Sequence, residues 1–229
     1  MDDKIKEYWD RKILDWEKNA YEESTSGQSL VEKVASKFRG SLRERMNIAL
    51  GLVQPHVGGQ TVLDLGCGSG TFCFRLLQNG AAKTIGFDFS PHAINLAGER
   101  AKTLGVEDKC GFEVHDIREA TLPPVDITTG LGLLDYLNRD ELVQFLGKVH
   151  SKHFLFTFSE KKLSVMNALH LVYLKSQKCP SAYHYSEAEM RGFLEKANLN
   201  DFRFVRDPRM SIGTIVCHLP DSPLANTKI

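Results

Sequence analysis

The sequence predicts an α/β fold with a seven-stranded, mostly parallel sheet and a C-terminal antiparallel hairpin. From residue 61 onward, short apolar runs alternate with amphipathic runs of helical period. Such alternation indicates right-handed crossovers, which make neighbouring strands parallel and cover both faces of the sheet. The last two apolar runs are joined by a turn around Asp207-Pro208, and strands joined so directly must be antiparallel.

The elements of this sheet follow one another in a regular order. The predicted strands cover 61–65, 83–89, 110–116, 125–132, 153–159, 201–208 and 211–219. The predicted helices between them cover 71–80, 91–105, 138–150 and 186–199. Ser90 is a typical N-cap with Pro91 at the first helical position. Ser186 and Glu189 form the S-x-x-E capping box that begins the last helix.

The N-terminal part of the chain is predicted to form a helical lid. Apolar residues at helical spacing predict a helix over 5–21, and two further helices are predicted over 30–38 and 42–57. The third helix is expected to end near Pro55 and the Gly58-Gly59 pair. The predicted division is therefore a helical lid at 1–58, a core domain at 59–219 and a flexible tail at 220–229.

Composition and charge argue against several classes of protein. Lys plus Arg and Asp plus Glu each number 29, so the formal net charge is zero, which argues against a nucleic-acid partner. The N-terminus lacks the apolar core of a signal peptide, and no run approaches the ~18 apolar residues of a membrane span. The five cysteines include no CxxC pair and indicate reduced thiols in a cytoplasmic protein. Cysteines and histidines lack the spacing of metal ligands, and the oligomeric state is left open.

The stretch VLDLGCGSGTF carries the clearest chemical signal. Gly66, Gly68 and Gly70 follow a predicted strand that contains Asp64, and glycine lets a ligand approach the backbone closely. The dinucleotide fingerprint is G-x-G-x-x-G, with a pyrophosphate at the helix N-terminus. A carboxylate at the turn would repel a pyrophosphate but suits an ammonium group. The pattern therefore favours a zwitterionic nucleoside without phosphate and disfavours a nicotinamide-dependent oxidoreductase.

Acidic residues also close the next two predicted strands, at Asp88 and Asp116. In an open parallel sheet, ligands bind beyond the carboxyl ends of the strands, where the strand order reverses. Aspartates cap helices and begin turns in many proteins, so one of them would carry little weight. Three behind successive strands, together with the glycine turn, indicate a binding site.

Three segments of the chain resemble motifs of a known family. VLDLGCGSGTF, GFDFSPHAINLA and EVHDIRE are similar to motifs I, II and III of the class I S-adenosylmethionine-dependent methyltransferases, in order and at the expected spacing. The resemblance covers roughly 62–219 and implies a Rossmann-like core with S-adenosylmethionine as cofactor. The residues that it implies for cofactor binding are Asp64, Gly66, Gly68, Gly70, Asp88, Phe89, Asp116, Ile117, Leu131 and Arg43.

The resemblance also implies a role for each position. Asp64 would order the glycine turn and face the methionine amino group, and Asp88 would accept both ribose hydroxyls. Phe89 would pack on the adenine ring. Asp116 would accept the adenine amine, beside the backbone N–H of Ile117.

Two further contacts concern the methionine end of the cofactor. The carbonyl of Leu131 would accept the amino group. Arg39 or Arg43 could reach the carboxylate, although a solvated helix face would also explain either arginine.

The acceptor side is less clearly marked. After the fourth predicted strand the chain reads TTGLGLLDYL, not the Asn/Asp-Pro-Pro-Tyr/Phe motif typical of methyltransferases that act on amino groups of nucleic acids or glutamine. Asp135 and Tyr136 stand where the acceptor pocket should begin, with a helix-start role and core packing as the respective alternatives. Tyr21 in the lid is a candidate acceptor contact. His184 is the candidate general base, because its ordinary pKa lies near neutral pH; exposure to solvent is its alternative.

The Tyr21 region, LLDYL and YHYSEAEM together resemble the branch that contains magnesium-protoporphyrin carboxyl methyltransferases and their small-molecule relatives. Arg139 stands where the porphyrin enzymes carry a histidine, so the resemblance indicates architecture and not a porphyrin substrate. The expected activity is methyl transfer to a small-molecule acceptor, at a hydroxyl or carboxylate oxygen. A small-molecule N-methyltransferase and a non-catalytic S-adenosylmethionine-binding accessory module are the alternatives.

Overall fold

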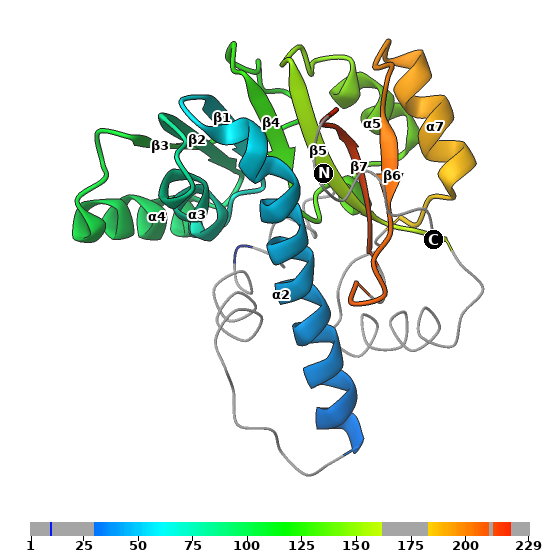
Figure 1. Cartoon of the computed structure of the whole chain (residues 1–229), viewed down its shortest axis with the longest axis horizontal. Coiled ribbons are helices and arrows are strands. Elements are labelled where there is room, and N and C mark those ends of the chain that lie inside the picture. Colours follow the sequence, from blue (N-terminus) through cyan, green and yellow to red (C-terminus); the bar gives the residue numbers. More distant parts are fainter. Residues whose placement is uncertain (1–9, 11–29, 162–182, 211–212, 221–229) are drawn as a thin grey trace.

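The computed structural model describes residues 10, 30–161, 183–210 and 213–220 (Figure 1). Its centre is a seven-stranded sheet with the strand order β3-β2-β1-β4-β5-β7-β6. The strands are β1 (Thr61–Leu65), β2 (Lys83–Asp88), β3 (Cys110–Val114), β4 (Ile127–Gly130), β5 (His153–Ser159), β6 (Arg203–Val205) and β7 (Gly213–His218). Strands β1 to β5 are parallel, which confirms the prediction.

The C-terminal hairpin joins this sheet at the β5 edge. β7 runs antiparallel to β5, with Leu155 opposite Cys217, and β6 pairs antiparallel with β7 outside it. Every residue of β5 is buried, as expected for a strand that is covered on both faces and paired on both sides. The hairpin therefore protects what would otherwise be an apolar edge of the parallel sheet.

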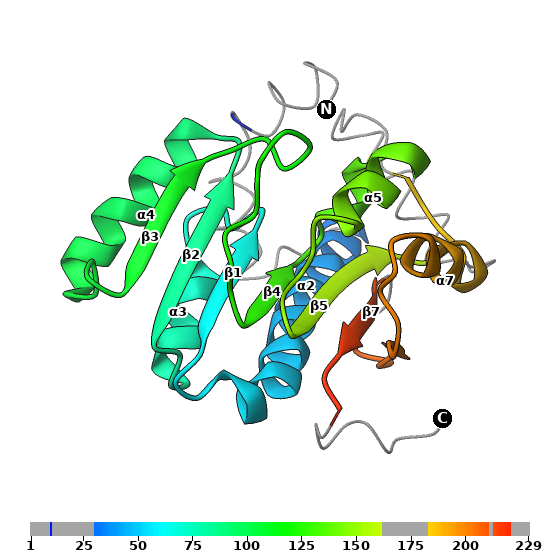
Figure 2. The same ribbon diagram turned by 90° about the horizontal axis from the view of Figure 1, so that it is seen from above.

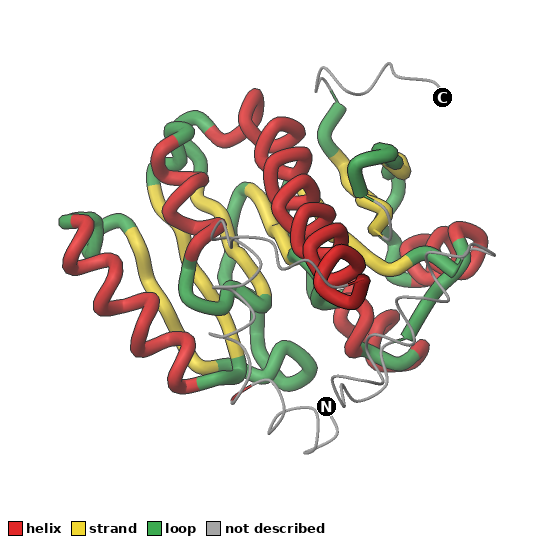
Figure 3. Tube along the Cα trace, turned by 90° about the horizontal axis from the view of Figure 1, so that it is seen from below, coloured by secondary structure: helices red, strands yellow, loops and turns green. Residues whose placement is uncertain are grey.

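Helices cover the two faces of the sheet (Figures 2 and 3). One face packs against α2 (Leu30–Val57), α3 (Thr71–Gln78) and α4 (Pro91–Leu104). The other packs against α5 (Arg139–Leu146), α7 (Glu187–Lys196) and the short 3₁₀ helix η1 (Leu134–Tyr136). Side chains alternate between the two faces along β1. Val62 packs on the face covered by α2 and α3, whereas Leu63 and Leu65 pack on the face covered by α5 and α7.

One helix boundary was predicted wrongly. The two helices expected over 30–38 and 42–57 are the single helix α2, which continues through Gly40 and ends at Val57 (Figure 1). A glycine inside a helix costs only about 1 kcal/mol. Burial of Met46 and Leu52 against the sheet outweighs that cost. Pro55 is tolerated inside the last turn, and the expected end near Gly58 is confirmed.

The predicted starts of two helices are confirmed. The Ser90 hydroxyl accepts from the Ala93 N–H at the start of α4, and Ser186 and Glu189 form the capping box of α7. The four cysteines within the described residues are buried free thiols. Among the described helices, no segment is long and apolar enough to span a membrane. The helix expected over 5–21 lies outside the described residues except for residue 10.

Candidate active site

The strand order reverses between β1 and β4, which lie side by side at the middle of the sheet. The arrowheads of β1, β2 and β3 point to the same edge in Figure 2. A crevice beyond this edge is where open α/β sheets bind their ligands. Asp64 and Asp88 lie in the last residues of β1 and β2, and the glycine turn and Asp116 follow β1 and β3 at this edge.

The glycine turn has the backbone that only glycine adopts readily. Gly66, Gly68 and Gly70 have φ angles of +69°, +54° and +79°, which is the left-handed region. The N–H groups of Gly66 and Cys67 both donate to the carbonyl of Phe87, at 2.8 and 3.1 Å. A Cβ on Gly70 would lie 2.7 Å from Cζ of Phe112. The turn is therefore fixed to β2 and has no room for side chains at its last glycine.

Asp88 lies at the tip of β2 and is 5% exposed. Its two carboxylate oxygens accept one N–H each, from Gly68 and from Ser90, both at 2.9 Å. Burial raises the pKa of Asp88, and the hydrogen bonds from Ser90 and Gly68 oppose that rise. Because an ionised carboxylate offers about four acceptor positions, Asp88 can accept further donors while it holds the glycine turn.

The hydroxyl of Ser90, beside Asp88, donates to Asp10 at 2.6 Å. This contact brings a residue from the N-terminal part of the chain to the tip of β2.

Asp64 is buried between β1 and α3, two residues before the first glycine of the turn. Its Oδ1 accepts from the Thr129 hydroxyl of β4 at 2.9 Å, and its Oδ2 is 3.8 Å from Sγ of Cys73. The pKa of the Cys73 thiol is raised well above its ordinary value by burial and by the charge of Asp64. Asp64 thus links β1, β4 and α3 at the switch point of the sheet.

The tip of β3 is shaped by an ion pair that the sequence did not predict. Arg118 donates to both carboxylate oxygens of Asp116, through Nε at 3.0 Å and Nη2 at 2.5 Å, and also pairs with Glu141 of α5. Ile117 is buried in the core. Phe89 is half-buried. The hydrogen bonds from Arg118 therefore occupy part of the acceptor capacity of the Asp116 carboxylate.

The segment after β4 connects this edge to α2. Leu131 is half-buried, and the N–H of Gly132 donates to the Thr157 hydroxyl of β5 at 2.7 Å. Gly132 has φ +79°, and a Cβ there would lie 2.9 Å from Nη1 of Arg45 on α2. Arg43, two residues earlier on α2, is also half-buried.

Asp135 is a buried carboxylate that reaches β5. Its Oδ1 accepts from the backbone N–H of Ser159 at 2.7 Å, and its Oδ2 from the Ser159 hydroxyl at 2.9 Å. Burial raises the pKa of Asp135, while the bonds from Ser159 and the charges of Arg45 and His184 lower it. Its side chain bridges η1 to the end of β5, so a helix-start role alone does not describe it.

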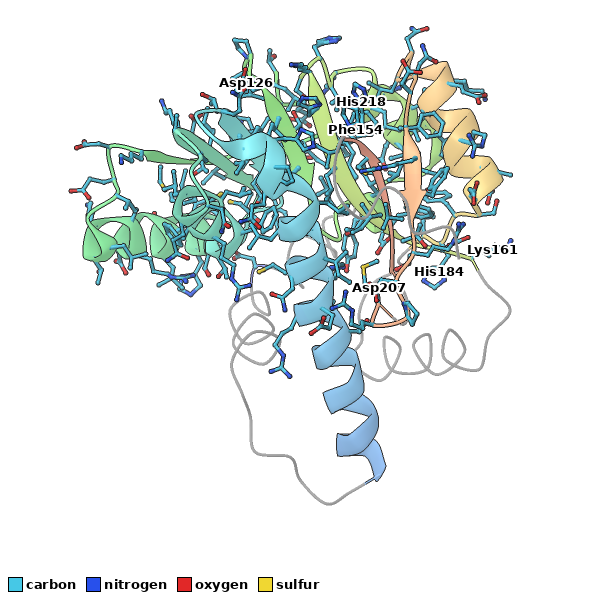
Figure 4. The ribbon with its side chains drawn as sticks, viewed as in Figure 1. Asp126, Phe154, Lys161, His184, Asp207 and His218 are labelled. Atoms are coloured by element: carbon cyan, nitrogen blue, oxygen red, sulfur yellow. The ribbon has the colours of Figure 1, made fainter. Side chains whose placement is uncertain are left out.

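His184 is carried to the same place by the segment that precedes α7. The N–H of Tyr183 donates to the carbonyl of Asp135 at 2.7 Å, and the Tyr185 hydroxyl donates to the carbonyl of Leu137 at 2.5 Å. His184 is half-buried, with its Nε2 atom buried. Figure 4 shows His184 near Lys161, which follows β5, and far from Asp126 and His218 at the opposite end of the sheet.

The hydrogen bond from the Tyr183 N–H to the Asp135 carbonyl brings the segment that carries His184 to Asp135, and the Tyr136 side chain is half-buried in η1. Tyr21 lies outside the described residues. Within the described parts of the chain, no cluster of three His, Cys, Asp or Glu side chains is placed to hold a metal ion.

Besides Arg118, sequence reasoning missed three further contributors to this edge. Ser159 donates two hydrogen bonds to the Asp135 carboxylate, and the guanidinium of Arg45 lies next to the backbone of Gly132. Arg100 of α4 donates to the carbonyl and hydroxyl of Ser69, at 2.8 and 2.5 Å, and so fixes the glycine turn from outside. Only Ser159 had a signal, as the polar residue that ends the fifth apolar run.

Comparisons with solved structures agree with this fold. Magnesium protoporphyrin IX methyltransferase from Synechocystis PCC 6803, solved with bound S-adenosylhomocysteine, is 19% identical with a TM-score of 0.72 and covers 95% of this chain and 98% of that chain. An O-methyltransferase family 2 protein from Planctomyces limnophilus is 19% identical with a TM-score of 0.56, over 83% of this chain and 65% of that one. At such identities the likeness shows the shared fold.

Curated relatives match over shorter segments. Ribosomal protein L11 methyltransferase from Enterobacter sp. is 47% identical over 76 residues, which are 31% of this chain and 26% of the relative. Nodulation protein NoeA from Rhizobium meliloti is 52% identical over 42 residues, 18% of this chain and 9% of the relative. The matched segments thus span about a quarter or less of these relatives.

The residues present fit S-adenosylmethionine. The left-handed glycine turn brings bare backbone to the crevice, and the Asp88 carboxylate at the tip of β2 keeps acceptor capacity for hydroxyl groups. A family model described as a methyltransferase domain matches residues 56–171, just over half of the chain. The chain therefore belongs to this family of methyltransferase domains, and its sheet has the fold of the class I methyltransferases.

Proposed function

We propose that the protein transfers the methyl group of S-adenosylmethionine to an oxygen atom of a small molecule. One observation carries this proposal: the N–H of Tyr183 donates to the carbonyl of Asp135 at 2.7 Å and so brings the next residue, His184, close to the buried Asp135 in the segment after β4. A histidine beside a carboxylate is the arrangement that can take a proton from a hydroxyl. The absence of the amine-type motif after β4 supports oxygen over an exocyclic amine.

The active site then has two halves. The cofactor half consists of Asp64, the glycine turn with Gly66, Gly68 and Gly70, and the strand tips at Asp88, Phe89, Asp116 and Ile117, joined by Leu131 and Arg43. The acceptor half consists of Asp135, Tyr136, Ser159 and His184, with Tyr21 assigned to it from the sequence alone.

In the cofactor half, the contacts of Asp64 and Asp88 support their proposed roles, and the roles of Asp116 and Phe89 are those that the family resemblance implies. Asp88 accepts the ribose hydroxyls with the acceptor positions that Gly68 and Ser90 leave. Asp116 accepts the adenine amine beside its bond with Arg118, and Phe89 packs on the ring. Asp64 fixes the turn through Thr129.

In the acceptor half, the chain positions the nucleophile. S-adenosylmethionine supplies a methyl group on a positively charged sulfur, which is a good leaving group. His184 removes the proton of an acceptor hydroxyl, and Asp135 stabilises the imidazolium that results. Ser159 keeps the Asp135 carboxylate in one orientation through two hydrogen bonds. A carboxylate acceptor would need no base and would use the same half for positioning only.

The proposal is tested with methyl-labelled S-adenosylmethionine and a small-molecule extract combined with a macromolecular fraction. After incubation, ultrafiltration separates low-mass from high-mass products. We expect label in the low-mass fraction, and mass spectrometry with mild alkaline hydrolysis separates methyl esters, which release methanol, from methyl ethers. Label on nitrogen in that fraction contradicts oxygen transfer while leaving the small-molecule acceptor in place.

A protein acceptor is the second candidate, because the matched relatives include ribosomal protein L11 methyltransferase. The match covers only 31% of this chain, so it favours this acceptor weakly. Label retained with the macromolecules, and released as methylated amino acids after hydrolysis, would replace the small-molecule proposal by this one.

A further inference from the structure

Lys148 lies just after α5, and its ammonium group donates to the backbone turn that follows β3. The Nζ atom lies 2.6 Å from the carbonyl oxygen of Arg118, 3.1 Å from that of Ala120 and 3.5 Å from that of Ile117. An ammonium group carries three N–H donors and no acceptor, so these three carbonyls can use all of its donors. The half-buried side chain is therefore bound to a single turn of the backbone.

The turn at 116–120 has two chemically different ends. The carbonyl of Asp116 accepts the N–H groups three and four residues later, at 3.0 and 2.9 Å, as in one turn of a helix. The carboxylate of Asp116 accepts the backbone N–H of Arg118 at 3.1 Å. In such a turn the first N–H groups point toward its beginning and the carbonyls toward its end. The Asp116 carboxylate and the Ile117 N–H therefore lie at one end, and the carbonyls that bind Lys148 lie at the other.

Helix α5 holds this turn in three ways. Ile117 and Ala120 are buried in the core cluster that also contains side chains of α5. In the first turn of α5, Glu141 pairs with Arg118 at 3.3 Å. Just beyond the last turn, Lys148 binds the carbonyls. The helix that follows η1 in the acceptor half thus also fixes the turn at the tip of β3.

We propose that Lys148 is a positioning residue for the adenine ring of the cofactor. It sets the place of the Asp116 carboxylate and the Ile117 N–H from the opposite end of the turn, and so acts without contact with the ligand. The inference rests on the proposed function, which assigns the adenine amine to Asp116. Because hydrogen bonds weaken steeply as distance and angle depart from the optimum, the amine is recognised fully only while the turn is held. Lys148 thus contributes to the selection of adenine over other purine bases.

The test compares two ligands by calorimetry: S-adenosylhomocysteine and S-inosylhomocysteine, in which an oxygen replaces the adenine amine. Wild type should bind S-adenosylhomocysteine at least about tenfold more tightly, the worth of one hydrogen bond to a charged group. In Lys148→Met, affinity should fall about tenfold for S-adenosylhomocysteine and less than about threefold for S-inosylhomocysteine, because only the first ligand loses the amine contact. A merely structural defect would weaken both ligands equally and leave the preference for adenine unchanged.

Two further variants carry the test if Lys148→Met folds poorly, which thermal unfolding shows. Lys148→Arg keeps the positive charge and several N–H donors, so it should keep most of the preference for adenine. Glu141→Gln removes the charge that pairs with Arg118, so it should lower the preference by about twofold, the worth of a partly exposed ion pair. Lys152→Met is the matched control, because Lys152 is an exposed lysine four residues further along the chain. It should bind both ligands as wild type does.

An unchanged preference for adenine in each of Lys148→Met and Glu141→Gln that folds, while wild type prefers S-adenosylhomocysteine, would overturn the positioning role and leave the role of Asp116 intact. Equal binding of the two ligands by wild type would contradict the role of Asp116 and the positioning role with it. Calorimetry measures no turnover, so either result is independent of the labelling experiment that tests methyl transfer to oxygen.

Discussion

The cofactor half and the acceptor half of the active site are built in different ways. In the cofactor half, backbone groups of neighbouring turns bond one another and Asp88, so the geometry is set by the sheet itself. In the acceptor half, Asp135 of η1 links two segments: its side chain accepts from Ser159 at the end of β5, and its backbone carbonyl accepts from Tyr183 before α7. We therefore expect a mutation in the cofactor half to lower both cofactor affinity and stability. A mutation in the acceptor half should lower the rate of methyl transfer while cofactor affinity and stability stay at their wild-type values.

Gly70→Ala should have the largest effect. The new Cβ would meet Phe112 at 2.7 Å in a left-handed backbone, so we expect a loss of about 2–4 kcal/mol in the free energy of unfolding and no measurable S-adenosylhomocysteine binding. Urea denaturation and calorimetry measure the two effects. Gly98→Ala in α4 is the control, since its Cβ meets nothing within 4 Å, and it should stabilise by about 0.5–1 kcal/mol. Equal stability and equal S-adenosylhomocysteine affinity in the two variants would contradict the steric requirement for glycine at position 70.

His184→Gln should separate the halves most clearly. Loss of the proposed base should lower the rate of label transfer to a hydroxyl by about 10²- to 10⁴-fold, while S-adenosylhomocysteine affinity stays at the wild-type value. Label transfer is measured with the acceptor fraction from the ultrafiltration experiment. His92→Gln, at an exposed position on α4, is the control. An undiminished rate in His184→Gln would assign the proton transfer elsewhere or show that the acceptor needs no base.

Asp135→Asn should lower activity without lowering stability. Burial raises the pKa of this carboxyl in the folded protein, so its protonated form is the one that favours folding. That contribution is complete below the ordinary carboxyl pKa and is lost as the pH rises through the folded-state value. The amide oxygen of Asn accepts from the Ser159 N–H, and the amide NH2 donates to the Ser159 hydroxyl oxygen, so both contacts are kept without the charge. We therefore expect stability at pH 7 equal to or above wild type, and label transfer reduced at least about tenfold.

The gap in stability between Asp135→Asn and wild type should grow as the pH rises from acid to neutral, which denaturation at several pH values measures. A variant that loses stability and activity in parallel would mean that Asp135 acts only as a structural link between η1 and β5.

Tyr185→Phe should have the smallest effect. The Tyr185 hydroxyl donates to the carbonyl of Leu137, and burial raises its pKa from 10.0 to about 12. A raised folded-state value means that the contribution is complete below pH 10 and is lost as the pH rises toward about 12. We expect a loss of about 1 kcal/mol at pH 7, with the difference from wild type shrinking above pH 10. Tyr183→Phe, at a 39% exposed position, should change stability by less than about 0.5 kcal/mol at either pH.

The two halves also differ in what the sequence could predict. The glycine turn, Asp64 and Asp88 were identified because their signals lie within short stretches that follow strands, and backbone geometry then fixes their positions. Ser159 and Arg45 were not identified as partners of this site, because long-range packing brings them there and no local pattern records it.

The break expected between 38 and 42 illustrates the same limit. Gly40 gives a local signal for ending a helix, but burial of the later turns of α2 outweighs it. Arg118 likewise donates hydrogen bonds to the Asp116 carboxylate, and no sequence motif predicts this pairing of side chains. Local chemistry was therefore predictable, and competition between side chains for the same partner was not.

The most direct test of the division into two halves is calorimetric titration of S-adenosylhomocysteine into Asp88→Asn and Asp135→Asn, with Asp108→Asn as an exposed control. Asp88→Asn should bind more weakly by about 1.5–3 kcal/mol, the worth of a hydrogen bond to a charged group, because the amide loses one of the acceptors offered to the ribose hydroxyls. Asp135→Asn and Asp108→Asn should bind as wild type does. Wild-type affinity in Asp88→Asn, or a comparable loss in Asp135→Asn, would contradict the division of the site on which the account depends.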